Sequence, residues 1–304
     1  MLEPIRNFMK VGTIHRVSYP YAGKDERETL ATLKKLLCDD YFDALEVTRF
    51  ADPSVRKEAI SMIRTAHLET VAYGGQGLLL SNNLNINDLD TNKRNKAIEV
   101  LKAGIDEAYE FGSSSFTFLA GRFEQETVEQ SFQALLESID EVCSYAKKSG
   151  NILIEIEVFD DAIDKCSLIG PSKRVVRLAE TACSTWDNFA IQVDSSHIPL
   201  LKESNEEHIL PILKYLRHVH MGNAVLADKN SIAYGDKHPR FGYPDSENDT
   251  HELAAYLRTL LKSGFLNSAD RPLVSFEVKP QPGEDPDLVL ANAKRTLNQA
   301  WLLV

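Results

Sequence analysis

Residues 152–158 read Ile-Leu-Ile-Glu-Ile-Glu-Val, a nearly unbroken run of aliphatic side chains. A short run of this kind is typical of a strand that is buried on both faces of a parallel sheet. Successive strand residues point to opposite faces, so Glu155 and Glu157 share one face. Burying two carboxylates is costly unless they are paired or bind a cation. The segment therefore predicts a buried strand that carries a functional site.

Seven similar segments lie on either side of this one, and amphipathic segments of helical period alternate with them. The eight strand candidates are Met9–Ile14, Ala44–Thr48, Thr70–Tyr73, Ser115–Leu119, Ile152–Val158, Ala190–Val193, His218–Met221 and Val274–Val278. The eight helix candidates are Glu26–Leu37, Val55–Thr65, Thr91–Phe111, Gln125–Lys148, Ser172–Cys183, Glu206–Leu216, His251–Ser263 and Pro286–Leu302. Eight strand–helix repeats predict an α/β fold, a (β/α)8 TIM barrel, with a single domain over residues 1–304. The alternative is a doubly wound open sheet, but that fold often begins with a glycine-rich phosphate loop, which this sequence lacks.

The composition of the chain excludes several classes of protein. Of its 304 residues, 43% are hydrophobic and 26% are charged, which is typical of a globular chain. No apolar run is long enough to cross a membrane, and the first ten residues lack the apolar stretch of a secretory signal. The formal net charge of -11 disfavours a nucleic-acid partner. The four cysteines are widely spaced, so we expect free thiols and a cytoplasmic protein without a membrane partner.

The last four predicted strands each carry an acid or a histidine at or near the carboxyl end. These residues are Glu157, Asp194, His220 and Glu277. Because the carboxyl ends of barrel strands meet at one mouth, the four side chains are expected to converge. Any one of them alone could be a cap, an ion-pair partner or a core residue, but their joint order favours ligands of one divalent cation. Three carboxylates and one imidazole suit Mn2+, Mg2+, Co2+ or Zn2+.

Other polar residues near the same strand ends are candidates for substrate binding, with core packing or a solvated loop as the alternative for each. His197 follows Asp194 by three residues and could orient a substrate hydroxyl or, with Asp236 and His238, hold a second metal ion. Arg240 and His238 suit a substrate oxyanion. The remaining pocket candidates are His15, Glu46, Tyr73, Gln76, Arg122 and Lys279.

With these residues identified, the chain resembles the xylose-isomerase-like TIM-barrel superfamily over nearly its full length. The ketose 3-epimerase branch has a metal-binding Glu that closes strand five, Asp-x-x-His after strand six, a His that ends strand seven and a Glu on strand eight. The matching residues here are Glu157, Asp194 with His197, His220, and Glu277. Two positions differ from that branch, because Val158 stands where it usually has Pro and Leu226 where it has Arg.

A second branch, the endonuclease IV-like enzymes, is more distantly similar and binds three zinc ions. Its additional ligands match His197, Asp236 and His238. It also needs a histidine near strand three and another near strand four. The residues available at those two places are Tyr73 or Gln76 and Phe118 or Arg122. The complete three-zinc cluster is therefore not expected.

The resemblance implies a metal-dependent isomerase or epimerase that acts on a sugar, a sugar phosphate or a cyclitol. One of Glu157 and Glu277 would remove the proton beside the substrate carbonyl, and the metal ion would stabilise the enediolate. The alternatives are a metal-dependent phosphodiester hydrolase and a barrel that binds a metabolite without turnover. The expected partner is a small polyhydroxy ketone, and the family resemblance also suggests a homo-oligomer.

Overall fold

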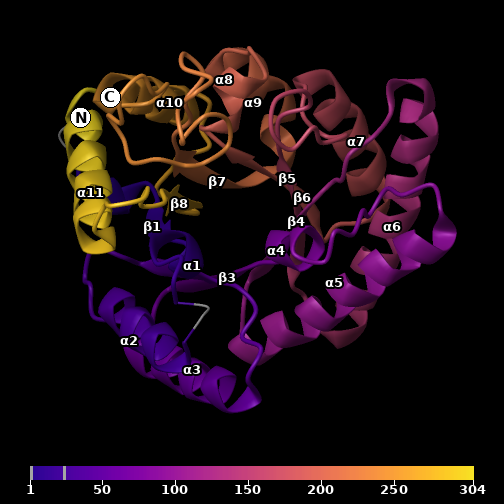
Figure 1. Ribbon diagram of the computed structural model, residues 1–304, viewed down its shortest axis with the longest axis horizontal. Coiled ribbons are helices and arrows are strands. Elements are labelled where there is room, and N and C mark those ends of the chain that lie inside the picture. Colours follow the sequence, from indigo (N-terminus) through magenta and orange to yellow (C-terminus); the bar gives the residue numbers. More distant parts are fainter. Residues whose placement is uncertain (1–2, 23–24) are drawn as a thin grey trace.

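The computed structural model describes residues 3–22 and 25–304. Eight parallel strands lie in chain order around a nearly closed barrel, and helices surround them (Figure 1). The strands are β1 (Lys10–Thr13), β2 (Ala44–Val47), β3 (Thr70–Gly74), β4 (Ser115–Leu119), β5 (Leu153–Val158), β6 (Phe189–Asp194), β7 (Leu216–Gly222) and β8 (Leu273–Glu277). All eight predicted strands are confirmed, and the fold is a single-domain (β/α)8 TIM barrel.

The predicted helices also form. The helices that follow the strands are α2 (Glu26–Leu37), α3 (Pro53–Ala66), α5 (Thr91–Phe111), α6 (Val128–Ser149), α7 (Ser172–Thr185), α9 (Asn205–Ile212), α10 (Thr250–Lys262) and α11 (Pro286–Leu302). The short helices and 3-10 turns are α1 (His15–Ser18), α4 (Gln76–Leu80), α8 (His197–Leu200), η1 (Ile5–Asn7), η2 (Gln125–Thr127) and η3 (Leu213–Tyr215). Two predicted boundaries differ, since α9 tightens into η3 after Ile212 with Leu216 already in β7, and the helix predicted from Gln125 begins as η2 before α6. Among the described residues, no helix has the length and apolar character needed to span a bilayer.

Aspartate side chains fix where several of these helices begin. Asp52 accepts hydrogen bonds from the backbone N–H groups of Ser54 and Val55 at the start of α3, where the sequence predicts a cap. Asp90 does the same for α5, and Asp285 for α11. Such a cap satisfies N–H groups that have no partner within the helix and contributes roughly 1 kcal/mol. The start of each helix is therefore encoded locally in the sequence.

The barrel has one seam without a continuous ladder. Hydrogen-bonded ladders join each neighbouring pair from β2 through β8, and β8 to β1. Between β1 and β2 the described residues form only the bridge from Ile14 to Glu46. Below that bridge, the backbone N–H of Asp43 donates to the carbonyl of Val11 at 2.8 Å, and the Asp43 carboxylate accepts from the N–H of Val11 at 3.2 Å. A side chain thus replaces part of the missing ladder.

The two faces of β5 divide as the alternation predicts. Ile154, Ile156 and Val158 are fully buried beneath the surrounding helices. Glu155 faces the barrel interior and accepts a hydrogen bond from Thr117 Oγ1 on β4 at 3.2 Å. The residue two positions further along, Glu157, faces the same interior at the carboxyl end of the strand. The parallel register therefore arranges the interior side chains in layers, with the last layer at the mouth.

Candidate active site

The acids and the histidine at the ends of β5 to β8 meet at the mouth of the barrel. One potential ligand atom from each of Glu157, Asp194, His220 and Glu277 lies within 4.8 Å of the others. His220 Nδ1 lies 3.3 Å from Glu157 Oε1 and 2.6 Å from Glu277 Oε2. The Glu277 side chain remains 14% exposed, whereas the other three are enclosed. The structure thus brings together the four residues predicted as metal ligands.

The oxygen atoms of this quartet are poorly satisfied by the protein itself. Glu157 Oε1, Asp194 Oδ2 and Glu277 Oε2 are buried and have no hydrogen-bond partner among the described residues, and their nearest charged neighbours are the imidazoles of His220 and His238. Burial raises the pKa of Asp194, and the neighbouring Glu277 carboxylate acts in the same direction. A divalent cation among these oxygens would remove both the desolvation cost and the mutual repulsion. The donor set therefore fits Mn2+, Mg2+, Co2+ or Zn2+.

Two neighbouring residues position the acids of the quartet. Gln76, at the start of α4, donates from Nε2 to Glu157 Oε2 at 2.6 Å. Asp194 accepts from the backbone N–H of Ser196 at 2.8 Å and lies directly against Gly222. A Cβ at Gly222 would stand 2.6 Å from both Asp194 carboxylate oxygens. The close approach of backbone and carboxylate requires glycine at the end of β7.

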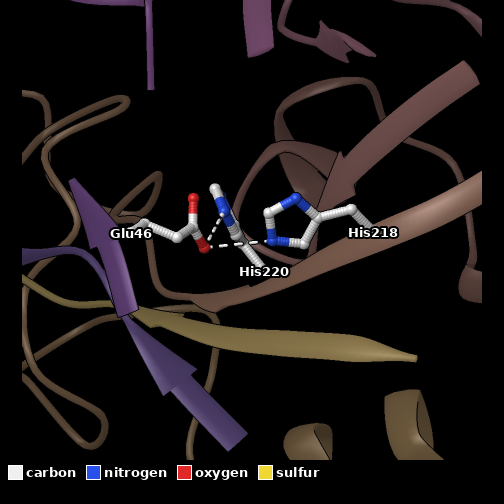
Figure 2. Close-up of side chains that lie close together, drawn as sticks. All are labelled: Glu46, His218 and His220. Carbon is white, nitrogen blue, oxygen red and sulfur yellow. Dashed lines mark hydrogen bonds and ion pairs between the residues drawn. The ribbon is translucent and has the colours of Figure 1, made fainter. Parts of the chain in front are cut away.

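A second acid–imidazole cluster shares His220 with the quartet and extends from it into the barrel interior. Glu46 reaches across the interior from β2 to β7, and its Oε1 lies 3.0 Å from His218 Nε2 and 3.1 Å from His220 Nε2 (Figure 2). His218 Nδ1 lies 3.1 Å from Glu155 Oε2. Burial acts to lower the pKa of His218, but the Glu46 and Glu155 carboxylates outweigh it and raise the pKa to about 9. These contacts fix the two rings of β7 in place.

The residues considered for a second metal ion lie together around a carboxylate that is already paired. Asp236 Oδ1 lies 3.1 Å from His197 Nε2 and 2.7 Å from His238 Nε2. Asp236 Oδ2 lies 2.5 Å from Lys165 Nζ. Burial acts to lower the pKa of both histidines, but Asp236 outweighs it and raises the pKa of His197 to about 10 and that of His238 to about 9. At the place considered for the second metal ion, the Lys165 ammonium thus already supplies a positive charge to Asp236.

A cavity of about 630 Å³ opens over the quartet, a size suited to a small molecule. Its wall includes six of the sequence-predicted residues, namely Glu46, Gln76, Glu157, Asp236, His238 and Glu277. Asp194 and His220 lie beneath this wall and His197 is buried behind it. The predicted site is therefore a cavity whose floor holds the quartet.

His15 and Tyr73 lie behind the cavity wall, although the sequence suggested them as pocket residues. The chain turns into α1 directly after β1, so His15 is carried toward α2, where its Nε2 lies 2.9 Å from Thr32 Oγ1. The Tyr73 ring faces the helices because it follows an interior position of β3, and its hydroxyl donates to Glu107 at 3.1 Å. Burial and this hydrogen bond raise the pKa of Tyr73 above its ordinary range. Both side chains therefore lie outside the cavity wall and contact the helices behind it.

Three further residues that the sequence suggested also lie outside the cavity wall, namely Arg240, Arg122 and Lys279. Arg240 Nε lies 3.0 Å from Glu284 Oε1, so its charge is already paired. Arg122 donates to the backbone carbonyl of Asp164 at 2.9 Å. Strand β8 ends at Glu277, so Lys279 does not continue its face, and its side chain is exposed. The structure thus does not place Arg240 at the cavity, where the sequence predicted it to bind a substrate oxyanion.

The cavity wall contains three basic residues that the sequence reading missed. Lys165 comes from the segment after β5, and Arg16 and Arg49 come from the segments after β1 and β2. Loop residues have no periodicity that fixes their direction, so strand alternation could not find them. Their position shortly after a strand end was the available signal, because barrel sites are built from those segments.

Comparisons with known proteins agree with this architecture. The chain is 16% identical to a D-tagatose 3-epimerase-like protein, with a TM-score of 0.72 over 97% of this chain and 99% of that one. It is 14% identical to a 3-keto-D-glucoside 4-epimerase from E. coli, with a TM-score of 0.66 over 97% and 99% of the two chains. It is 16% identical to a D-psicose 3-epimerase from Clostridium cellulolyticum H10, with a TM-score of 0.64 over the same shares. At these identities the solved structures establish a common fold.

A search of curated protein sequences found no significant match. The family model described as xylose isomerase-like TIM barrel matches residues 39–298, which is most of the chain. That match spans the strand ends from Glu46 to Glu277 that form the floor and wall of the cavity. The chain therefore belongs to the xylose isomerase-like TIM barrel family.

Proposed function

We propose that the protein is a divalent-metal-dependent epimerase or isomerase of a sugar or a related polyhydroxy ketone. The observation that carries this proposal is the quartet at the mouth of the barrel, in which buried carboxylate oxygens lack hydrogen-bond donors among the described residues. Such an arrangement suits a cation better than a set of ion pairs. The names of the structural neighbours, which include epimerases of tagatose, psicose and ribulose type, support the same class of substrate.

The residues that would hold the cation are Glu157, Asp194, His220 and Glu277. When bound there, a divalent cation supplies a Lewis acid that polarises a substrate carbonyl and stabilises developing negative charge. The cavity lies directly over this position and is lined by polar groups that suit hydroxyls, including Glu46, Gln76 and His238. A polyhydroxy ketone would therefore meet the quartet with its carbonyl end.

Proton transfer is assigned to Glu157 and Glu277. Both line the cavity, and they come from different strands on either side of the quartet. One carboxylate removes the proton from the carbon beside the carbonyl, and the other returns a proton from the opposite face to give an epimer. Return of the proton to the adjacent carbon gives an aldose–ketose isomer instead. Gln76 holds Glu157 in position, and Glu277 keeps more freedom because it is partly exposed.

The test is hydrogen exchange between solvent and substrate. Wild-type protein supplied with Mn2+ is incubated in deuterium oxide with a panel of ketoses, and label at the carbon beside the carbonyl is measured. Glu277→Gln should retain the fold and abolish label incorporation, whereas the matched control Glu58→Gln, on the exposed face of α3, should leave it unchanged. Equal labelling by Glu277→Gln would remove Glu277 from the proton transfer.

A phosphodiester hydrolase is the second candidate, because Asp194, His197 and His238 also have ligand atoms within 4.8 Å of one another. That chemistry needs a second ion. Metal analysis of the purified protein separates the two, since one ion per chain supports the epimerase and two support the hydrolase. A metabolite-binding barrel without turnover would bind metal and ketose and give no label. The cytoplasmic location and the homo-oligomer remain predictions, the former in keeping with four free cysteines.

A further inference from the structure

Two arginines face the cavity from the side of β1 and β2. Arg16 belongs to α1 and is partly buried, and Arg49 follows β2 and is exposed. Neither guanidinium forms an ion pair or a hydrogen bond with the described residues, and Arg16 Nε is buried without a partner. The Arg16 guanidinium lies over the ring of Phe50, 5.2 Å from its centroid. Both positive charges are therefore available to the contents of the cavity.

Arg16 and Arg49 differ from the arginines of this chain that lie against a carboxylate. The sequence has 45 acidic and 34 basic residues, so arginines have carboxylates to pair with. Arg56, Arg174 and Arg177, for example, each lie within 2.9 Å of a carboxylate oxygen. A buried guanidinium nitrogen without an acceptor carries a desolvation cost that an anion would remove. An anion in the cavity would supply the acceptor that Arg16 Nε lacks, and the exposed Arg49 lines the same cavity.

Glu107, an acid that acts on the Arg16 guanidinium, already has other partners. Glu107 lies close enough to Arg16 to influence it, since burial lowers the pKa of the Arg16 guanidinium and Glu107 acts in the opposite direction. The Glu107 carboxylate is, however, already occupied. It accepts from the backbone N–H of Phe50 at 2.7 Å, from Arg56 Nη1 at 2.9 Å and from the Tyr73 hydroxyl at 3.1 Å. Glu107 holds this region together and leaves Arg16 free.

We infer that the substrate carries an oxyanion, a phosphate or a carboxylate, that Arg16 and Arg49 bind. The inference rests on the proposed function, because it places the carbonyl of the substrate at the quartet and its anionic group at the arginines. The guanidinium groups of Arg16 and Arg49 each present forked N–H groups, which match the oxygens of a phosphate or a carboxylate. The arginines thus take the role that the sequence reading gave to Arg240, whose charge is paired with Glu284.

The experiment compares three ketoses that differ only at carbon 6. D-Fructose has a hydroxymethyl group there, D-fructose 6-phosphate a phosphate and D-fructuronate a carboxylate. Binding to Mn2+-supplied protein is measured by calorimetry for the wild type and for Arg16→Met, Arg49→Met and the double variant. Arg64→Met is the matched control, since Arg64 is an exposed arginine on α3 away from the cavity. Arg16→Lys retains the charge, and thermal unfolding checks that each variant folds.

At least one anionic ketose should bind about tenfold or more tightly than D-fructose, because charged hydrogen bonds are roughly twice as strong as neutral ones. Each methionine variant should lose much of that preference, while its affinity for Mn2+ stays as in the wild type. The preferred probe distinguishes a sugar phosphate from a sugar acid. Equal affinities for the three ketoses in wild type, or a preference that survives in the double variant, would overturn the inference.

If no ketose binds, the anion site is tested by measuring the binding of inorganic phosphate to the same variants. Phosphate binding that is weakened in the double variant but not in Arg64→Met supports the arginine site, and absent or unchanged phosphate binding overturns it. Label incorporation is measured in the same samples. Arginine-dependent binding without labelling would refute the proposed proton transfer and leave the anion site intact. Labelling without a preference for an anionic ketose would refute the anion site and leave the proton transfer intact.

Discussion

Replacement of Gly222 by alanine tests the quartet without removing any of its members. The new Cβ would stand 2.6 Å from both oxygens of Asp194 and 3.0 Å from its Cγ. The backbone cannot move aside easily, because the Gly222 carbonyl accepts from Ser195 Oγ at 3.1 Å and from Asn248 Nδ2 at 2.8 Å. Non-bonded heavy atoms prefer separations of roughly 3.5 Å. The carboxylate therefore has to withdraw by several tenths of an ångström.

A shift of that size exceeds the tolerance of a metal–oxygen bond, which is about 0.2 Å. We expect Gly222→Ala to weaken Mn2+ binding by about 10- to 100-fold, or roughly 1.4 to 2.8 kcal/mol. Calorimetric titration of the metal-free protein measures the affinity, and thermal unfolding without metal checks the fold. Gly77→Ala is the matched control, because a Cβ at Gly77 meets nothing within 4 Å. Equal Mn2+ affinity in Gly222→Ala and wild type would show that Asp194 does not bind the metal.

Two further predictions concern the segment after β5. Lys165→Met should lower the free energy of unfolding by about 3 kcal/mol, because it leaves the buried Asp236 without its ammonium partner. Metal analysis of this variant should find a second ion beside His197 and His238. An unchanged stoichiometry of one would contradict this role of Lys165. Asp160→Asn should cost about 2 kcal/mol at pH 7, because the carboxylate accepts backbone hydrogen bonds from residues 162 to 166. Burial acts to raise the pKa of Asp160, but these donors outweigh it and lower the pKa, so its stabilising effect is present above pH 4 or so and is lost as the pH falls through the folded value. Denaturant unfolding of both proteins should therefore converge toward acidic pH, and a gap that stays constant down to pH 2 or so would refute the assignment.

Strand alternation was sufficient to predict the floor of the site. Each member of the quartet lies within two residues of the carboxyl end of a strand, where chain direction and the two-residue period fix the side to which it points. The same period could have excluded Tyr73. Its register partner on β2 is Val47, one residue after the interior-facing Glu46, so Tyr73 faces the helices.

The cavity wall depends on contacts that a single sequence does not reveal. Arg16 lies in a short helix, and Lys165 in a segment that folds around Asp160. Their directions are set by packing between segments that are distant in sequence, as with Lys165 and Asp236, which are 71 residues apart. Arg240 was assigned from its charge alone, and the acid that neutralises it, Glu284, belongs to the segment after β8.

The incomplete ladder between β1 and β2 divides the site into two halves of unequal stiffness. Hydrogen-bonded ladders join β5 through β8, with one register shift at Ile191/Gln192, so the members of the quartet are held in place relative to one another. Arg16 and Arg49 instead follow the two strands that flank the seam, where Ile14 and Glu46 form a single bridge. We expect thermal motion of the barrel to be largest between β1 and β2, so that the distance between the two guanidinium groups varies. If the proposed function holds, the anion-binding end of the cavity can then adapt to substrates of different length while the geometry of the quartet at the opposite end stays constant.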